Sequence, residues 1–159
     1  MTKAIVTLAV CALLVALASA TRVNECKSGK AIEDTTKVQI TNCETPPCKL
    51  KKRTKVQIVQ RFTPNRDVQS VKTAVYATIL GVPLPFVGVD GTDACGKVFN
   101  AADGSPAPCP LKKGVEYLYK NEFPILPVYP TVQLVVHWAL EEPDKKVVTC
   151  FEVPSRITV

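Results

Sequence analysis

Hydrophobic and polar residues alternate with a period of two in several short segments of the chain. The clearest segment runs from Thr131 to Leu140, where every second residue from Val132 onward is apolar and the opposite face includes Gln133 and His137. Such alternation predicts a strand with one buried face. Shorter segments of the same kind are 37–41, 56–63, 71–80, 115–123 and 146–153. Because no helical periodicity separates them, we predict an all-β fold, an antiparallel β-sandwich of two sheets.

Two connections between these strands are apolar and rich in proline. They are residues 81–88, with the sequence GVPLPFVG, and residues 123–130, with the sequence FPILPVYP. Proline fixes φ and has no N–H for a ladder, so we expect both segments to be rigid and extended outside the sheets. Their apolar side chains either cap the core at one end of the sandwich or line the mouth of a ligand cavity. Both interpretations stay open at this point.

The first 20 residues have the layout of a secretory signal peptide. A cation at Lys3 precedes an apolar segment, 4–18, and small residues follow it up to Ala20. The apolar segment is shorter than the roughly 20 residues that a membrane-spanning helix needs. We therefore predict a signal peptide over 1–20 and a single domain over 21–159. The exported protein is expected outside the cell or in the lumen of endosomes and lysosomes.

Six cysteines remain once Cys11 leaves with the signal peptide. An even number of cysteines in an exported chain suggests three disulfides, although many pairings are possible. Two short intervening loops suggest local pairs, which leave a third: Cys43–Cys48, Cys95–Cys109 and Cys26–Cys150. Zinc is the rival explanation, but the spacings contain no CxxC pair and one histidine follows the signal peptide. We expect neither a metal nor another cofactor.

The chain is basic, with a formal net charge of +6. The densest group of cations is the basic cluster, which consists of Lys49, Lys51, Lys52, Arg53 and Lys55. It fits either a solvated turn between two strands or a surface that docks on anionic lipid headgroups. Nucleic-acid binding is not expected, because no aromatic residues for base stacking are interleaved with these cations.

Catalytic motifs are missing from the sequence. His137 is the single imidazole, and alternation puts it on the strand face opposite Trp138, so we expect a surface histidine. No serine stands in a GxSxG motif. Glu141, Glu142 and Asp144 lie together on a predicted turn, whereas a glycosidase needs two carboxylates that face each other across a cleft. We expect no enzymatic activity, which leaves binding.

Three segments carry a resemblance to a known family. They are GVPLPF at 81–86, Tyr129-Pro130 leading into LVVHWAL at 134–140, and CFEVP at 150–154. On these segments, and in the order of its six cysteines, the chain resembles the ML lipid-recognition family. Within that family it is most similar to the soluble sterol-transfer proteins of the Niemann-Pick type C group, above all those of arthropods.

The resemblance implies an immunoglobulin-like β-sandwich whose sheets part at one end to admit an apolar ligand. It also implies the three disulfides named above. Three residues would form the entrance: Phe86, Ile125 and Tyr129. The deeper ligand-binding positions would be Ile40, Leu50, Val56, Ile58, Val75, Leu84, Tyr117, Tyr119, Phe123, Pro124, Leu134, Val136, Trp138 and Phe151.

The function that the resemblance implies is transport of a sterol to membranes or to a membrane acceptor, by a monomer that touches anionic membrane surfaces transiently. The sterol hydroxyl is expected to stay at the mouth, in water, because an unpaired buried hydroxyl is costly. Two alternatives stay open: a carrier or sensor of fatty acids, semiochemicals or microbial glycolipids, and an adhesion or receptor module without a ligand. The segment between Cys95 and Cys109 is longer than is usual in the family's sterol carriers, which bears on ligand choice.

Overall fold

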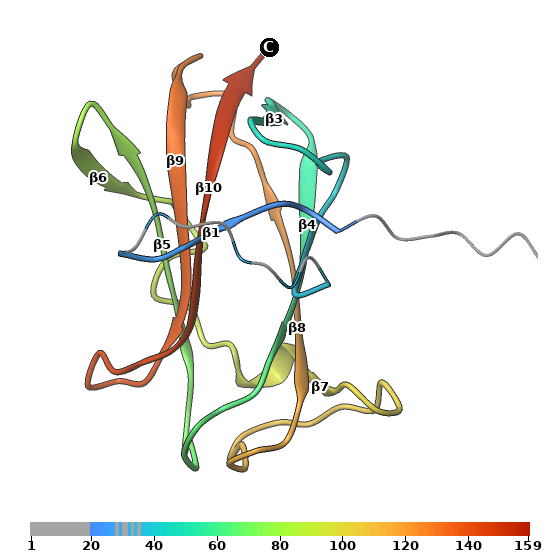
Figure 1. Cartoon of the computed structure of the whole chain (residues 1–159). Helices are drawn as coiled ribbons and strands as arrows, with labels where there is room; N and C mark the ends of the chain where they lie inside the picture. The colour runs from blue at the N-terminus through green and yellow to red at the C-terminus, as the bar shows by residue number, and fades with distance from the viewer. Residues whose placement is uncertain (1–19, 28, 30–31, 33, 35) are drawn as a thin grey trace, which may run out of the picture.

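Two β-sheets pack face to face in the computed structural model, which describes residues 20–27, 29, 32, 34 and 36–159 (Figure 1). The predicted signal peptide lies outside the described residues except for Ala20. Within the described part of the chain, no helix has the length and hydrophobicity of a membrane span. The predicted all-β sandwich is confirmed.

Each sheet combines strands that are distant in sequence. The first sheet contains β1 (Asn24–Glu25), β3 (Cys48–Lys51), β5 (Lys72–Ile79), β6 (Val82–Pro85), β9 (Gln133–Glu141) and β10 (Val147–Thr158). Its order is β1-β10-β9-β5-β6, and β3 also pairs with β10. The second sheet has the order β2-β4-β8-β7 and contains β2 (Val38–Ile40), β4 (Lys55–Phe62), β7 (Val98–Asn100) and β8 (Tyr117–Pro124). A short 3₁₀ turn, η1 (Cys95–Lys97), precedes β7.

The pairing of β3 with β10 is parallel, whereas the other pairings between the named strands are antiparallel, as predicted. The reason is a change of sheet at the turn between β3 and β4. β3 lies along residues 155–158 of β10, while β4 joins the other sheet and pairs with β8. β1 pairs with β10 at residues 151–152, so β1 and β3 share one edge of this long strand.

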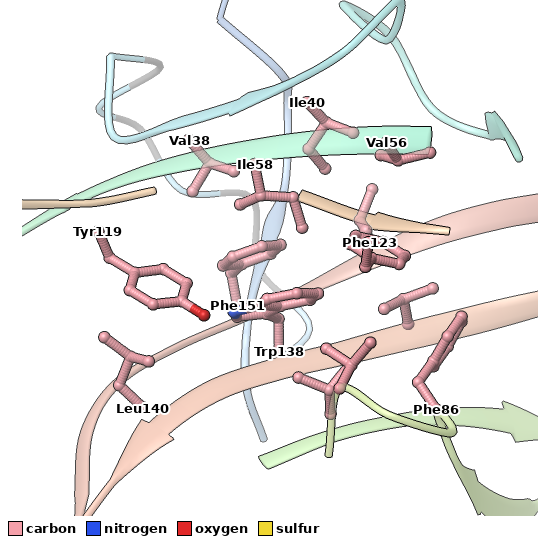
Figure 2. Close-up of a cluster of buried hydrophobic side chains, with 14 of the residues drawn as sticks. Val38, Ile40, Val56, Ile58, Phe86, Tyr119, Phe123, Trp138, Leu140 and Phe151 are labelled. Carbon is pink, nitrogen blue, oxygen red and sulfur yellow. The ribbon is translucent and has the colours of Figure 1, made fainter. Parts of the chain in front are cut away.

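Alternation in β9 places its apolar face in the core, as predicted. Trp138 and Leu140 are fully buried, and Leu134 and Val136 are nearly so. Figure 2 shows side chains from β9 and β10 packed against side chains from β2, β4 and β8. The core of the protein is therefore the layer between the two sheets.

Residues 82–85 form a strand, which corrects the prediction that 81–88 lies outside the sheets. β6 pairs with β5 through a two-residue turn, Leu80–Gly81, in which both residues have positive φ (49° and 84°). This is the turn geometry that suits a tight hairpin. The prolines are tolerated because β6 is an edge strand. Val82 pairs with Ile79 next to the turn. The backbone nitrogens of the alternate residues 83 and 85 therefore point away from β5, where no N–H is needed. Of the second segment, 123–130, residues 125–130 lie outside the strands as predicted, whereas Phe123 and Pro124 belong to β8.

The three predicted disulfides are confirmed. Cys26–Cys150 joins the segment after β1 to the middle of β10, across 124 residues of sequence. Cys43–Cys48 closes a five-residue separation before β3, and Cys95–Cys109 connects η1 to the far end of the loop that follows β7. Together they tie the chain ends and two surface loops to the sandwich.

Candidate ligand-binding site

A small apolar pocket lies at one end of the sandwich, beneath β6. We call it the outer pocket; its volume is about 60 Å³. It is lined by Ala77, Ile79, Leu84, Pro85, Phe86, Tyr129, Pro130, Leu134 and Ile157. The lining comes from β5, β6, β9, β10 and the two proline-rich connections. These connections therefore cap one end of the core and also line a pocket, which are the two roles left open by the sequence.

Phe86 closes the inner side of this pocket. Its ring meets those of Phe123 and Tyr129 edge-on, with centroids 5.9 and 5.5 Å apart. The backbone is firmly held, because the Phe86 N–H donates to the Val75 carbonyl at 3.0 Å and the Phe86 carbonyl accepts from Val89 and Asp90. Since the backbone is anchored, rotation of the Phe86 ring is the motion that would open a passage inward.

A second void lies deeper between the sheets. We call it the inner void; its volume is about 10 Å³ and its surface is wholly apolar. It is lined by Ile40, Cys48, Leu50, Val56, Ile58, Phe123, Val136, Phe151, Val153 and Ser155. Phe86 lines the outer pocket and Phe123 lines the inner void, so this pair of touching rings separates the two spaces.

The predicted binding residues fall into three groups. Those around the outer pocket are Leu84, Phe86, Tyr129 and Leu134, and those around the inner void are Ile40, Leu50, Val56, Ile58, Phe123, Val136 and Phe151. Four more are buried in the same core without lining either space: Val75, Tyr117, Tyr119 and Trp138. The structure thus brings most of the predicted set into one continuous apolar layer.

Two predicted residues lie elsewhere. Pro124 is exposed, because its neighbour Phe123 points inward and successive strand residues face opposite sides. Ile125, expected at the entrance, is fully buried. Its backbone bonds with Arg53 and Thr54 draw the segment inward. Of the three residues expected at the entrance, Phe86 and Tyr129 line the outer pocket and Ile125 does not.

The interior is much more closed than the resemblance implies. Pockets that hold small-molecule ligands enclose about 300–1,000 Å³, whereas the two spaces here measure about 60 and 10 Å³. The aromatic rings of the core fill the volume between the sheets: Trp138 lies 5.3 Å from Phe123 and 6.3 Å from Tyr119 between centroids. A surface hollow of about 540 Å³ beside Gln39 and Gln57 is partly polar and lies around β2 and the β4 residues opposite it. A guest between the sheets requires the rings or the sheets to move apart.

Polar groups are present within this apolar core. Asn121 donates from Nδ2 to the Tyr119 hydroxyl at 2.8 Å, and its Oδ1 accepts from Lys97 Nζ at 2.7 Å. Burial raises the pKa of Tyr119 far above its ordinary value, so its hydroxyl stays neutral. Gln60 is 2% exposed. The sequence carried a signal for it, because Gln60 interrupts the apolar face of the segment 56–63.

His137 is largely covered, which corrects the expectation of a surface histidine. Its side chain is 15% exposed, and its ring stacks on Tyr76 with centroids 4.3 Å apart. Nδ1 lies 3.1 Å from a Glu152 carboxylate oxygen, and the ring nitrogens lie 3.4–3.9 Å from the sulfurs of Cys26 and Cys150. Cys26, which is bonded to Cys150, contributes to this cover. Because the two sulfurs are bonded to each other, they offer no thiolate to a metal.

Exposed apolar side chains gather near the outer pocket. Leu80 at the β5–β6 turn is 99% exposed, Val87 is 66% exposed and Val128 is 81% exposed. Figure 1 shows the β5–β6 hairpin and β3 at the same end of the sandwich as the end of β10. Lys51, Lys52 and Arg53 of the basic cluster border Pro127 there. We call this region the mouth end.

The opposite region, the closed end, contains η1, β7, the start of β8 and the start of β10. Figure 1 shows it at the far side of the sandwich from the β5–β6 hairpin. Phe62 and Tyr117 pack there with ring centroids 6.0 Å apart, and both are buried.

Comparison with known proteins places the chain in a family. The family model described as the ML domain matches residues 20–157. The NPC intracellular cholesterol transporter 2 homolog a of Drosophila melanogaster is 34% identical over 92% of this chain and 94% of its own length. The NPC intracellular cholesterol transporter 2 of Sus scrofa is 30% identical over 89% of this chain and 88% of its own length. The crystal structure of a Niemann-Pick type C2 protein from the Japanese carpenter ant superposes with a TM-score of 0.63 at 27% identity, covering 76% of this chain and 89% of that one. The chain belongs to the ML domain family.

Proposed function

We infer that this protein is a lipid carrier that encloses a sterol between its two sheets and delivers it to a membrane or a membrane acceptor. The observation that supports this most directly is the apolar outer pocket, separated by the Phe86 ring from the apolar inner void. The Drosophila and pig relatives bear the name of cholesterol transporters, which favours the same ligand class. Nothing in this function requires catalysis.

Entry would begin at Phe86 and Tyr129 and continue past Phe123 towards Trp138. Moving the Phe86 and Phe123 rings would join the two spaces, and further separation of the sheets would make room for the body of the lipid. Burying about 400 Å² of apolar sterol surface contributes on the order of 10 kcal/mol. Association and side-chain ordering offset several kcal/mol of this. We therefore expect a dissociation constant near micromolar.

Delivery would use the mouth end. Its exposed apolar side chains, Leu80, Val87 and Val128, suit transient contact with a bilayer. Each cation of the neighbouring basic cluster would add about 1 kcal/mol near an anionic surface. A monomer suffices for this cycle, because the proposed site is built from one chain.

The carrier would act outside the cell or in the lumen of endosomes and lysosomes. Three disulfides favour an oxidising compartment. Cleavage after Ala20 would leave residues 21–159 as one domain. Mass spectrometry of the secreted protein checks this, since a mature mass that includes residues 1–20 would contradict the signal peptide.

A single-chain lipid such as a fatty acid is the second candidate, and the small size of the two spaces favours it. A narrow alkyl chain needs less separation of the sheets than a rigid ring system does. The same small volumes favour a third candidate, an adhesion module with a filled interior.

Extraction of bound lipid separates these candidates. The secreted protein is purified without detergent and extracted with organic solvent, and the extract is analysed by mass spectrometry. A fluorescent sterol and a fluorescent fatty acid are then titrated into the delipidated protein. Recovery of sterol and saturable sterol binding support the first candidate. Fatty acid without sterol supports the second, and failure to bind either probe would leave the adhesion module.

A further inference from the structure

Two buried polar atoms have no hydrogen-bond partner within the part of the chain that the structure describes. They are Nε1 of Trp138, whose side chain is fully buried, and Oε1 of Gln60, which is 2% exposed. A buried polar atom without a partner costs stability, so folded proteins pair nearly all of them. Two such atoms in the layer between the sheets are therefore evidence for a missing polar partner.

Both atoms belong to residues around Tyr119. Gln60 on β4 stands directly opposite Tyr119 on β8, and both side chains point into the core. Trp138 on β9 reaches Tyr119 from the other sheet, with ring centroids 6.3 Å apart. Figure 2 shows the indole nitrogen and the Tyr119 hydroxyl turned towards each other. The Gln60 side chain has one hydrogen bond, in which its Nε2 donates to Thr149 Oγ1 of β10 at 2.8 Å.

This polar spot lies deep in the proposed passage. Leu134 lines the outer pocket, and Trp138 follows it by four residues on the same face of β9. At the rise of a strand, this separation is about 13 Å. The leading end of an elongated lipid that enters lengthwise would reach it, whereas the headgroup at the mouth would not.

The two atoms have complementary hydrogen-bonding roles. The indole N–H donates only, and the amide oxygen accepts only. A hydroxyl both accepts and donates, so one alcohol group can satisfy both atoms. A ketone or a carboxylate accepts only and would leave the Gln60 oxygen without a donor.

We propose that the interior selects a lipid whose buried end, opposite its headgroup, carries a hydroxyl group. Trp138 donates to this hydroxyl and Gln60 accepts from it. The proposal rests on the lipid-carrier function above and refines its substrate class. It differs from the expectation that a single hydroxyl stays at the mouth, because it assigns a second polar group to the far end of the ligand.

Matched ligand pairs test the proposal on the intact, delipidated protein. Cholesterol is compared with 25-hydroxycholesterol, and palmitic acid with 16-hydroxypalmitic acid, by displacement of a fluorescent probe. A net hydrogen bond is worth roughly tenfold in affinity, so we expect about tenfold tighter binding of the hydroxylated member in at least one pair. The corresponding ketone or ω-carboxylate can accept from Trp138 but cannot donate to Gln60, so its affinity should increase less than that of the alcohol.

Variants connect the preference to the two atoms. Gln60→Leu removes the acceptor at similar volume and should lower the affinity ratio of the pair. Trp138→Phe removes the donor and should reduce the ratio as well. Gln57→Leu is the matched control, because Gln57 lies on the same strand with its side chain exposed, where it bonds Glu122. That variant should keep the ratio of the unmodified protein.

The outcomes separate this proposal from the lipid-carrier function. Equal affinities within both pairs, or a ketone as tight as the alcohol, would overturn the hydroxyl proposal and leave the carrier function standing. A preference that is unchanged in Gln60→Leu would overturn it too. Failure to bind any of the four lipids would overturn both.

Discussion

The two ends of the sandwich differ in how they treat apolar side chains. At the mouth end, Leu80 and Val128 are in water and the outer pocket reaches the surface. Towards the closed end, Phe62 and Tyr117 are buried, and Lys97, Asn121 and Tyr119 form a chain of hydrogen bonds. From this contrast we infer that the mouth end would open more readily than the closed end.

Removing the Cys26–Cys150 disulfide should have the largest effect. Cys150 precedes Phe151, which pairs with Trp138. The disulfide therefore ties the segment after β1 to the part of β10 that lies beside the buried Trp138. Chain-entropy arguments give a loss of about 5 kcal/mol in unfolding free energy for the double variant Cys26→Ser, Cys150→Ser. The matched control is the double variant Cys43→Ser, Cys48→Ser. The disulfide that it removes closes a far shorter loop, so its unfolding free energy should fall by about 2 kcal/mol. Denaturant titration measures both, and equal losses would contradict the comparison.

Trp138→Ala should come next. This side chain is fully buried between Phe123 and Tyr119, so its truncation leaves a large cavity and should cost about 4 kcal/mol. Lipid affinity should fall as well, because Trp138 lies on the proposed passage. Thermal melting and probe titration are the measurements, and a loss of affinity without loss of stability would show that the residue is not part of the common core.

Phe86→Ala should separate affinity from stability. Phe86 borders the outer pocket, so part of its surroundings is already empty, and we expect a loss of about 2 kcal/mol in unfolding free energy together with weaker sterol binding. Phe62→Ala is the matched control at the closed end, with a loss of about 3 kcal/mol and unchanged affinity of the folded protein. If both variants lost stability equally and bound equally well, Phe86 would be ordinary core.

Leu80→Asn should have the smallest effect on stability, and unlike the other variants it should stabilise the protein. A leucine at φ 49° is strained, whereas asparagine adopts this conformation more readily, so the variant should gain up to about 1 kcal/mol. Loss of the apolar tip should slow sterol transfer to anionic vesicles while leaving affinity in solution unchanged. Val147→Thr removes an exposed apolar residue from the closed end and should leave the transfer rate unaltered. Equal transfer by all three proteins would contradict a role for the mouth end.

Local patterns in the sequence predicted what depends on local structure. Alternation found the buried face of β9, and short loops suggested two of the three disulfides. Pairings between distant segments were not readable: the parallel contact of β3 with β10, the burial of Ile125 by its bonds to Arg53 and Thr54, and the cover over His137 all depend on chain segments far apart in sequence. Proline has no N–H for a ladder hydrogen bond, which argued against a strand at 82–85. This argument does not exclude a strand at the edge of a sheet.

The volume of the space between the sheets was the other feature that the alternation of apolar and polar residues could not predict. Alternation identifies which side chains face the core, but it says nothing about how tightly Phe123, Trp138 and Phe151 fill it. Their volumes and rotamers decide whether the space between the sheets is a cavity or a packed layer. Gln60 was visible as a polar residue on an apolar face, yet its lack of a partner for Oε1 appears only once its neighbours are placed.

The prolines of β6 have a consequence for how copies of this protein meet. Positions 83 and 85 face away from β5, so the outer rim of the sheet lacks backbone donors there. A neighbouring molecule therefore finds few groups to pair with and cannot extend the sheet by adding a strand of its own. The protein can therefore expose the apolar Leu80 beside this edge strand and still resist the growth of fibrils from the edge.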